Sequence, residues 1–271
     1  MKLVPRPISS FIPRIIHQVY SNDNLPIKIS DNIGHLRELN PQWEYRFYND
    51  LKMGSYIKSH FPGLITYYNR IAPAYGAARA DFFRYLVMYR EGGVYLDIKS
   101  SGSKPFSDVL RDDDIFYLSH WPNGLGQTYE GWGIHNELSS AKGEFQQWFI
   151  AGVSGHPFLH CVITAICNNI DSYDKYRDQV GRAAVLNVTG PIAYTKAILP
   201  VINQYPYRLV DSSDDLGLIY SIFENGSGVG HHHIYRRHYS KLRSGLVLNG
   251  DRKKILPYIG LKLRIFLQSI R

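Results

Sequence analysis

Residues 78–101 read ARADFFRYLVMYREGGVYLDIKSS, and the fold prediction starts from this stretch. Residues 79–90 contain no glycine or proline and have a broad apolar stripe, which predicts a helix packed into the core. Gly92-Gly93 ends the helix, because glycine adopts the left-handed conformation there without steric cost. Three apolar residues then predict a short buried strand that ends at Asp97. In open α/β sheets ligands bind at that edge, so Asp97 is the first candidate site residue.

The chain before this stretch alternates between strand and helix patterns. Residues 12–20 are rich in β-branched and apolar side chains, which predicts a first, central strand. A polar helix is predicted over residues 27–39, and residues 43–48 alternate as a second strand. Because strands that alternate with helices favour parallel pairing, we predict an α/β, Rossmann-type fold with a mostly parallel central sheet flanked by helices.

Length and composition predict one folded unit. The 271 residues are 44% hydrophobic, which is enough to bury one substantial core. We therefore predict a single domain over residues 1–271, with its core at about residues 12–240. The N-terminus lacks a continuous apolar signal region and no run of ~20 apolar residues occurs, which favours a cytoplasmic location. Cys161 and Cys167 do not form a CxxC pair and are expected to be free thiols.

The basic character of the chain bears on its partners. The formal net charge is +8, but no nucleic-acid-binding motif accompanies it, so no nucleic acid partner is expected. Residues 251–271 are apolar with basic side chains between them. They predict either a covering helix or, as the alternative, peripheral association with the anionic inner face of a membrane.

Three further segments give local predictions. Asp112-Asp113-Asp114 could bind a metal, but adjacent carboxylates repel one another and point apart, so a solvated turn is predicted. Residues 121–136 are rich in glycine and aromatic side chains and are expected to form an irregular wall over the site. Thr189 is expected to cap a helix whose first turn contains Pro191, and such a helix start can present backbone N–H groups to a ligand.

Several blocks of sequence together resemble glycosyltransferase family 32, the DXD-type sugar transferases that include fungal mannosyltransferases and bacterial capsule and polysaccharide enzymes. The blocks are IPRIIHQVY at 12–20, NPQWEYRFYND at 40–50, the stretch at 78–100, NVTGPIAYT at 187–195 and HHHIYRRHYSKL at 231–242. The middle block is the most specific of them. The resemblance implies a GT-A fold, a nucleotide-diphospho-sugar donor, a divalent cation and transfer with retention at the anomeric carbon.

The resemblance also implies roles for individual residues. Asp81 and Arg84 match the family's Asp and Arg before Gly-Gly, which hold the sugar and phosphate of the donor. Positions i and i+3 share a helix face, which suits such a pair, although a simple intrahelical ion pair is the alternative. The other donor-binding residues are expected at two strands: His17, Gln18, Val19, Tyr20, Tyr95, Leu96 and Asp97. Thr189, Gly190 and Pro191 are expected in a loop that contacts acceptor or donor.

The metal motif departs from the family pattern. Where the family has Asp-x-Asp, this chain has Asp97-Ile98-Lys99, and a lysine ammonium repels a divalent cation. Asp97 could bind Mn²⁺ or Mg²⁺ together with a late histidine, Lys99 could neutralise the diphosphate in place of the metal, or Lys99 could point outward. The first interpretation is favoured, and its candidate histidine ligands are His231, His233 and His238. The predicted catalytic residues are Arg84, Asp97 and Lys99.

These features predict a glycosyltransferase that moves a hexose from a UDP- or GDP-sugar to a hydroxyl of a glycan or glycolipid. No carboxylate is placed as a nucleophile, so we expect the acceptor to attack on the same face of the sugar, with the leaving phosphate helping to take the proton. One alternative is a glycoside hydrolase that uses Glu130 or Glu137 as an acid. The other is a non-catalytic protein that binds a sugar or nucleotide, which the altered Asp-x-Lys motif would permit.

Overall fold

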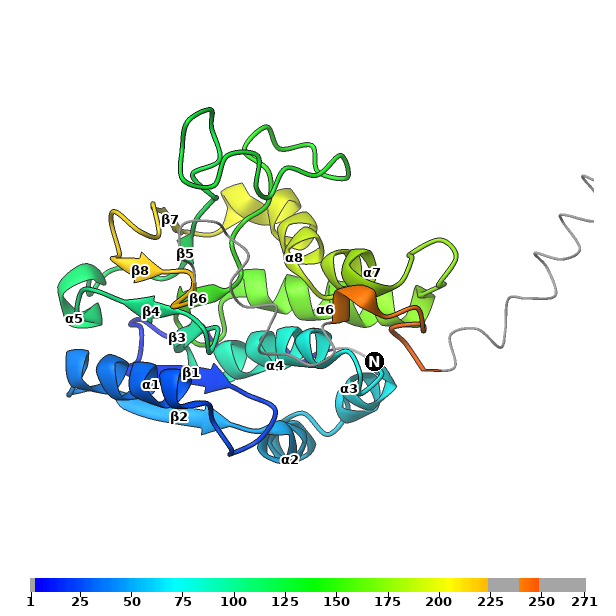
Figure 1. The fold of residues 1–271 in the computed structure, drawn as a ribbon, viewed down its shortest axis with the longest axis horizontal. Helices are drawn as coiled ribbons and strands as arrows, with labels where there is room; N and C mark the ends of the chain where they lie inside the picture. The colour runs from blue at the N-terminus through cyan, green and yellow to red at the C-terminus, as the bar shows by residue number, and fades with distance from the viewer. Residues whose placement is uncertain (1–2, 224–238, 249–271) are drawn as a thin grey trace, which may run out of the picture.

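The computed structural model describes residues 3–223 and 239–248, and its centre is a mixed four-stranded sheet (Figure 1). The strands are β1 (Ile15–Val19), β2 (Glu44–Tyr48), β3 (Gly93–Leu96) and β6 (Phe149–Gly152), in the order β2-β1-β3-β6. β1 is parallel to β2 and to β3, whereas β6 is antiparallel to β3. The predicted α/β fold with a mostly parallel sheet is confirmed, although the sequence pattern missed β6.

The helices connect and cover these strands. α1 (Ile27–Leu39) leads from β1 to β2, and α2 (Asp50–His60), α3 (Ile65–Arg70) and α4 (Gly76–Glu91) lead from β2 to β3. After β6 come α6 (Pro157–Ser172), α7 (Gly181–Val188), α8 (Pro191–Ile198) and the 3-10 helix η1 (Leu199–Gln204). Since α6 packs against both α4 and α8, and α7 packs against α8, these four helices form one group (Figure 1).

Short elements complete the described chain. β4 (Ser101–Gly102) pairs antiparallel with β8 (Leu218–Ile219), and β5 (Tyr117–Leu118) pairs parallel with β7 (Arg208–Leu209). α5 (Phe106–Val109) lies between β4 and β5 in the chain, and η2 (Tyr239–Lys241) lies within residues 239–248. Each of the four strands in these two pairs is only two residues long.

Alternation along the strands divides the core between the two faces of the sheet. Val94 and Leu96 pack in a cluster that includes Leu36 of α1. Tyr95 packs in the larger cluster, to which α4 and α6 contribute most of their buried side chains. Because successive side chains point to opposite faces, the residue after Leu96 returns to the face of α4. Asp97 therefore follows β3 on the side where α4 lies.

Gly92-Gly93 makes the tight connection from α4 to β3 that the sequence predicted. The φ angles are +70° and +97°, which favour glycine. A Cβ on Gly92 would lie 2.7 Å from the amide nitrogen of Ser154, and a Cβ on Gly93 would overlap the carbonyl oxygen of Ile15. The two glycines therefore allow the end of α4 to approach β1 and the chain after β6.

The aspartate run is only partly the solvated turn that we expected. Asp112 and Asp113 are exposed, but Asp114 is buried. Its Oδ2 accepts a hydrogen bond from the hydroxyl of Tyr117 and lies 3.1 Å from Nη1 of Arg208. The prediction is wrong for Asp114 because its cationic partner comes from β7, far away in the chain.

Residues 121–136 contain no helix or strand, as predicted, and belong to the long excursion between β5 and β6 that projects beside α8 in Figure 1. Within the described ranges, Gly181–Gln204 is long and apolar enough to cross a membrane, with a mean hydropathy of 1.3 in its 18-residue apolar window. This stretch comprises α7, α8 and η1, and 56% of the window is buried; core helices of folded domains pass the same test. Residues 251–271, the predicted membrane-contacting segment, lie outside the described residues.

Candidate active site

Arg84 is at the centre of the candidate site. It is only 4% exposed, and its guanidinium lies 4.7 Å from the ring centroid of Tyr95. Nη2 is 3.1 Å from Oδ1 of Asp81 and 2.9 Å from Oδ1 of Asp97. Nη1 donates to the carbonyl oxygen of Gln147 at 2.7 Å. One guanidinium thus joins α4, the end of β3 and the segment before β6.

Asp81 is fully enclosed and has neutral partners in addition to Arg84. The side-chain amide of Gln147 donates to Oδ1 at 3.2 Å, and the hydroxyl of Thr189 donates to Oδ2 at 2.9 Å. Burial is the largest influence on this carboxyl and raises its pKa, although Arg84 and the two hydrogen bonds oppose the shift. Burial also disfavours the charged form of Arg84, but the neighbouring charges, that of Asp97 first, raise the pKa of the guanidinium above its usual value. Arg84 therefore remains charged between the two carboxylates.

Asp97 is the accessible end of this cluster. Its side chain is 25% exposed, against 4% for Asp81. Its backbone N–H donates to the carbonyl oxygen of Trp148 at 2.7 Å, and its carbonyl oxygen accepts from the amide of Ser100 at 2.8 Å. These backbone bonds hold the turn after β3, so the carboxylate is presented from a fixed position.

Lys99 follows in the same turn and lies against an aromatic ring. Its Nζ is 3.7 Å from the ring centroid of Tyr220. Ile98, between the two charged residues, is 6% exposed and packs with Ile29 and Ile33 of α1. Asp97 and Lys99 are both partly exposed and leave the turn away from this small core. The ammonium of Lys99 thus has an aromatic partner, and its role toward a donor stays a prediction.

Three predicted donor-binding side chains of β1 are buried within the protein. His17 and Gln18 have no exposed surface, and Val19 packs in the larger core cluster. Nε2 of His17 is 3.0 Å from the carbonyl oxygen of Gly92, and Nδ1 is 3.2 Å from the hydroxyl of Tyr48. His17 therefore supports the glycine turn, Val19 belongs to the core, and donor binding at this strand stays a prediction.

Gln18 and the strand residues before Asp97 also contact other parts of the protein. The amide of Gln18 donates to the carbonyl oxygen of Asp97 at 3.2 Å, and its Oε1 accepts from the hydroxyl of Tyr45 at 2.9 Å. Tyr95 and Leu96 are fully buried, so their side chains position the end of β3 instead of lining a donor pocket. Tyr20, just after β1, is partly exposed and stays a predicted donor-binding residue.

The burial of His17 makes a prediction about pH. Burial lowers its pKa from 6.5 to about 4, whereas the unfolded chain binds the proton near the ordinary value. The stability that neutral His17 contributes is therefore complete above about pH 6.5 and is lost as the pH falls toward 4. We expect a loss of about 2 kcal/mol from this residue between pH 7 and pH 5. Urea unfolding of the native chain and of His17→Gln at both pH values measures this. The unfolding free energy of the native chain should fall by about 2 kcal/mol more than that of the variant. An equal fall in both proteins would contradict the prediction.

Thr189 has a role different from the predicted helix cap. Gly190 is the N-cap residue of α8, Pro191 begins the helix, and Thr189 ends α7. The Thr189 hydroxyl binds Asp81 instead, and its carbonyl oxygen accepts from the hydroxyl of Tyr85 at 3.0 Å. The capping prediction is wrong because a buried carboxylate is the better acceptor for this hydroxyl. The contact does bring Thr189 into the Arg84 cluster.

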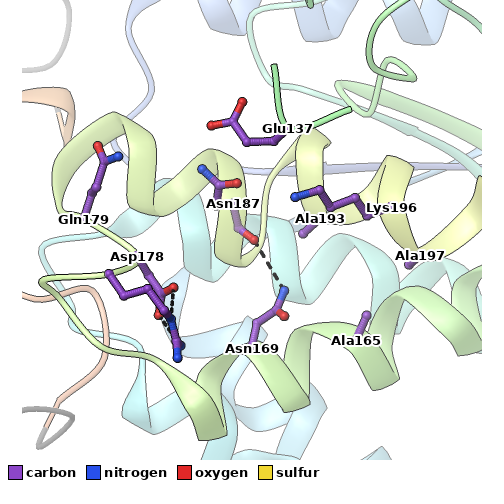
Figure 2. Close-up of a pocket in the computed structure, with 10 residues that line it drawn as sticks. Glu137, Ala165, Asn169, Asp178, Gln179, Asn187, Ala193, Lys196 and Ala197 are labelled. Carbon is purple, nitrogen blue, oxygen red and sulfur yellow. Dashed lines mark hydrogen bonds and ion pairs between the residues drawn. The ribbon is translucent and has the colours of Figure 1, made fainter. Parts of the chain in front are cut away.

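A separate cavity of about 390 Å³ lies among α6, α7 and α8 (Figure 2). Its polar lining includes Glu137, Asn169, Asn187 and Lys196, and none of the residues of the Arg84 cluster lines it. The side-chain amide of Asn169 donates to the carbonyl oxygens of Asn187 at 3.4 Å and of Val188 at 3.1 Å. α6 therefore braces the chain immediately before Thr189.

The sequence analysis missed two partners of the site. Gln147 binds both Asp81 and Arg84, and Tyr220 lies under the ammonium of Lys99. Tyr220 itself packs against Trp121, Tyr129, Trp132 and Trp148, so residues of the predicted aromatic wall lie close to Lys99. The polar pair Gln146-Gln147 inside the apolar run 145–149 was the available signal for Gln147.

The described residues do not form a divalent-cation site of the Asp-x-Asp kind. Oδ1 of Asp97 is paired with Arg84, and Lys99 stands at the second acidic position with an ammonium that has no lone pair for a metal. Within residues 3–223 and 239–248, no three His, Cys, Asp or Glu side chains come together as metal ligands. His231, His233 and His238 lie outside these ranges, so their metal-binding role stays a prediction.

Comparison with known proteins agrees with this geometry. Residues 26–116 match the family described as "Glycosyltransferase sugar-binding region containing DXD motif". That range includes Asp81, Arg84 and the turn at Asp97-Ile98-Lys99. Residues 26–116 of this chain are therefore similar to the sugar-binding region of these glycosyltransferases. The resemblance that the sequence motifs indicated is thereby confirmed.

The chain is similar to curated fungal proteins. Inositol phosphoceramide mannosyltransferase 3 of Schizosaccharomyces pombe is 30% identical over 155 residues, which cover 57% of this chain and 37% of that protein. The initiation-specific alpha-1,6-mannosyltransferase of the same yeast is 26% identical over 254 residues, which cover 83% of this chain and 60% of that protein. The chain thus spans less than two thirds of the length of these two relatives.

Solved structures confirm the GT-A-type fold of the chain. PaToxG Glycosyltransferase superposes with a TM-score of 0.51 at 20% identity, covering 73% of this chain and 72% of that one. The UDP-bound glycosyltransferase domain from the YGT toxin gives a TM-score of 0.54 at 10% identity, covering 81% and 83%. At these identities the likeness concerns the fold alone.

Proposed function

We propose that this glycosyltransferase moves a hexose from a UDP- or GDP-sugar to a hydroxyl group of a glycan or glycolipid. The observation that carries the proposal is the bridge that Arg84 makes between Asp81 and Asp97 at the C-terminal end of β3. That end is the ligand-binding edge of an open α/β sheet, and Asp97 is partly exposed there. Its carboxylate can accept hydrogen bonds from sugar hydroxyls while Arg84 fixes its orientation.

The same geometry supports same-face attack and retention. Asp81 is enclosed by Arg84, Gln147 and Thr189, and Asp97 is tied to Arg84, so neither carboxylate is arranged as a nucleophile. In the proposed reaction a bond forms between the acceptor oxygen and the anomeric carbon as the bond to the β-phosphate breaks. The electron pair stays on the phosphate oxygen, which takes the proton of the acceptor hydroxyl. A trapped covalent glycosyl-enzyme in mass spectrometry would contradict this course.

The relatives indicate which acceptor to test first. One relative is named inositol phosphoceramide mannosyltransferase 3, and another initiation-specific alpha-1,6-mannosyltransferase. We propose the same broad classes of acceptor, glycolipid or glycan, for this chain. Association with a membrane surface and a cytoplasmic location stay predictions.

Replacement of Asp97 by alanine tests the proposal. We expect the release of nucleoside diphosphate from the donor, in the presence of acceptor, to fall by about 100-fold or more, because the exposed carboxylate of the cluster is lost. The donor is found first by a thermal-shift screen of UDP- and GDP-sugars with and without Mn²⁺, since ligand bound to the folded state raises its stability. Asp112→Ala, an exposed aspartate away from the cluster, is the control. Full activity of Asp97→Ala would refute the assignment.

The two alternative functions make different predictions. A hydrolase needs two opposed carboxyl groups, but Glu130 is exposed with Oε2 accepting from the amide of Gly126, while Glu137 lines the cavity in Figure 2. Sugar release without any nucleotide dependence would favour the hydrolase. Binding of a nucleotide-sugar with no turnover for any acceptor or metal would favour a non-catalytic protein.

A further inference from the structure

We propose that Lys99 supplies the positive charge that a divalent cation supplies in glycosyltransferases with an Asp-x-Asp motif, so that the nucleoside diphosphate of the donor binds without a metal ion. The proposal rests on the glycosyltransferase function proposed above and concerns how that site holds the diphosphate. DXD-type glycosyltransferases of the GT-A fold typically use a divalent cation, which stabilises the leaving phosphate.

The charge of the motif is the first argument. The family is defined by a DXD motif, and this chain has Asp97-Ile98-Lys99 in the matched region. An aspartate replaced by lysine changes the local charge from −1 to +1, which is the two units that a divalent cation contributes. Asp81, Arg84, Asp97 and Lys99 together comprise two carboxylates and two cations. The described cluster is therefore balanced by its own side chains.

The contacts of Asp97 are the second argument. Its Oδ1 lies 2.9 Å from Nη2 of Arg84, so the carboxylate that would bind a metal already has a cationic partner. A metal ion at Asp97 would approach both this guanidinium and the ammonium of Lys99 in the same turn. Like charges so close together disfavour each other's binding, whereas a diphosphate is attracted to both.

The position of Lys99 is the third argument, because its backbone is held on both sides of the turn. The carbonyl oxygen of Lys99 accepts from the amide of Ile222 at 2.9 Å, and the hydroxyl of Ser100 donates to the carbonyl oxygen of Tyr220 at 2.7 Å. The pairing of β4 with β8 continues these contacts. The segment 218–222 thus fixes the turn that carries Lys99.

The ring of Tyr220 then places the ammonium itself. Nζ of Lys99 is 3.7 Å from its centroid, and the ring is buttressed by Trp121 and Trp148. A cation held over an aromatic face keeps its charge and can still donate hydrogen bonds to phosphate oxygens. Because Lys99 is two residues from Asp97 and partly exposed, it is suitably placed for the leaving phosphate of a donor bound at Asp97.

Calorimetric titration of nucleotides into the full chain tests the proposal. UDP, GDP and the matching monophosphates are titrated in excess EDTA and again with Mn²⁺. We expect one diphosphate to bind in EDTA at least about tenfold more tightly than its monophosphate, and Mn²⁺ to change that affinity by less than about threefold. Lys99→Met should lower the diphosphate affinity by about tenfold or more and leave the monophosphate affinity nearly unchanged.

Two further variants make this test specific. Lys99→Asp restores the family motif, so we expect weak diphosphate binding in EDTA and recovery of about tenfold or more when Mn²⁺ is added. Lys52→Met is the matched control, because Lys52 lies on α2 outside the cluster and its Nζ is 5.6 Å from the ring centroid of Phe47 on β2. It should bind like the native chain. Thermal unfolding of each variant verifies that it is folded.

The outcomes separate this inference from the proposed function. If the native chain binds diphosphate only when Mn²⁺ is present, the inference about Lys99 is wrong and the glycosyltransferase proposal stands. If Lys99→Met keeps the native preference for diphosphate over monophosphate in EDTA, the inference is also wrong. If neither nucleotide nor nucleotide-sugar binds under any condition, the proposed function itself fails.

Discussion

Replacement of Arg84 by methionine is expected to abolish transfer and to weaken the fold. The guanidinium is the common partner of Asp81 and Asp97 and also binds the carbonyl oxygen of Gln147. Its removal leaves a buried carboxylate without its cation, which costs about 3–5 kcal/mol of unfolding free energy. We expect donor turnover to fall by about 10³-fold, because Asp97 loses its orientation and the phosphate loses a nearby charge. Urea unfolding and nucleoside diphosphate release measure the two effects.

Two companion variants show whether these losses are specific to Arg84. Arg79→Met removes an arginine of the same helix whose Nε donates to the carbonyl oxygen of Ile71 and whose guanidinium lies over Tyr68. We expect it to cost about 1–2 kcal/mol of stability with little change in turnover. Arg84→Lys keeps the charge but lacks the planar fork that reaches both carboxylates, so it should stay well below native activity. Native turnover in Arg84→Met would refute the central role of this residue.

Alanine at Gly93 is expected to prevent folding of the core or to destabilise it by at least about 3 kcal/mol. The residue has φ of +97°, which L side chains rarely adopt, and the new Cβ would overlap the carbonyl oxygen of Ile15. The overlap cannot be relieved by rotation of a side chain, since the obstructing atom is the backbone of β1. The yield of soluble protein and the denaturant midpoint measure the effect.

Gly54 provides the matched comparison for Gly93. It lies inside α2, and no atom lies within 4 Å of the position that a Cβ would take. Gly54→Ala should therefore stabilise the protein by up to about 1 kcal/mol through helix propensity. If both alanine variants unfolded at the same denaturant concentration as the native chain, the tight approach of α4 and β1 would not be essential.

The sequence predicts those parts of the fold whose causes are local. Apolar alternation gave β1 and β2, and the helix of residues 79–90 with its two glycines gave α4 and β3, because periodicity and turn chemistry act over a few neighbouring residues. β6 and α7 were missed. β6 is a buried four-residue strand, too short for its apolar run to show a period, and its pairing with β3 is a distant contact.

The candidate site likewise has features that the sequence predicts and features that depend on distant contacts. The family resemblance indicated Asp81 and Arg84, whose i, i+3 spacing suits an ion pair, and the end of an apolar strand indicated Asp97. The hydrogen-bond partners of Asp81 could not be predicted, because Gln147 and Thr189 are 66 and 108 residues away in the chain. The sequence likewise left three interpretations of Lys99 open, and its contact with Tyr220, a residue far away in the chain, could not be predicted.

The pairing of β4 with β8 has a consequence for the order in which the protein becomes competent during synthesis. Asp81, Arg84 and Asp97 emerge from the ribosome early, but the segment that holds Lys99 in place is made more than a hundred residues later. A nascent chain that lacks residues 218–222 could form the parallel strands while the turn at Lys99 has no supporting segment. If Lys99 binds the diphosphate as proposed, the full site is complete only after residues 218–222 have been made.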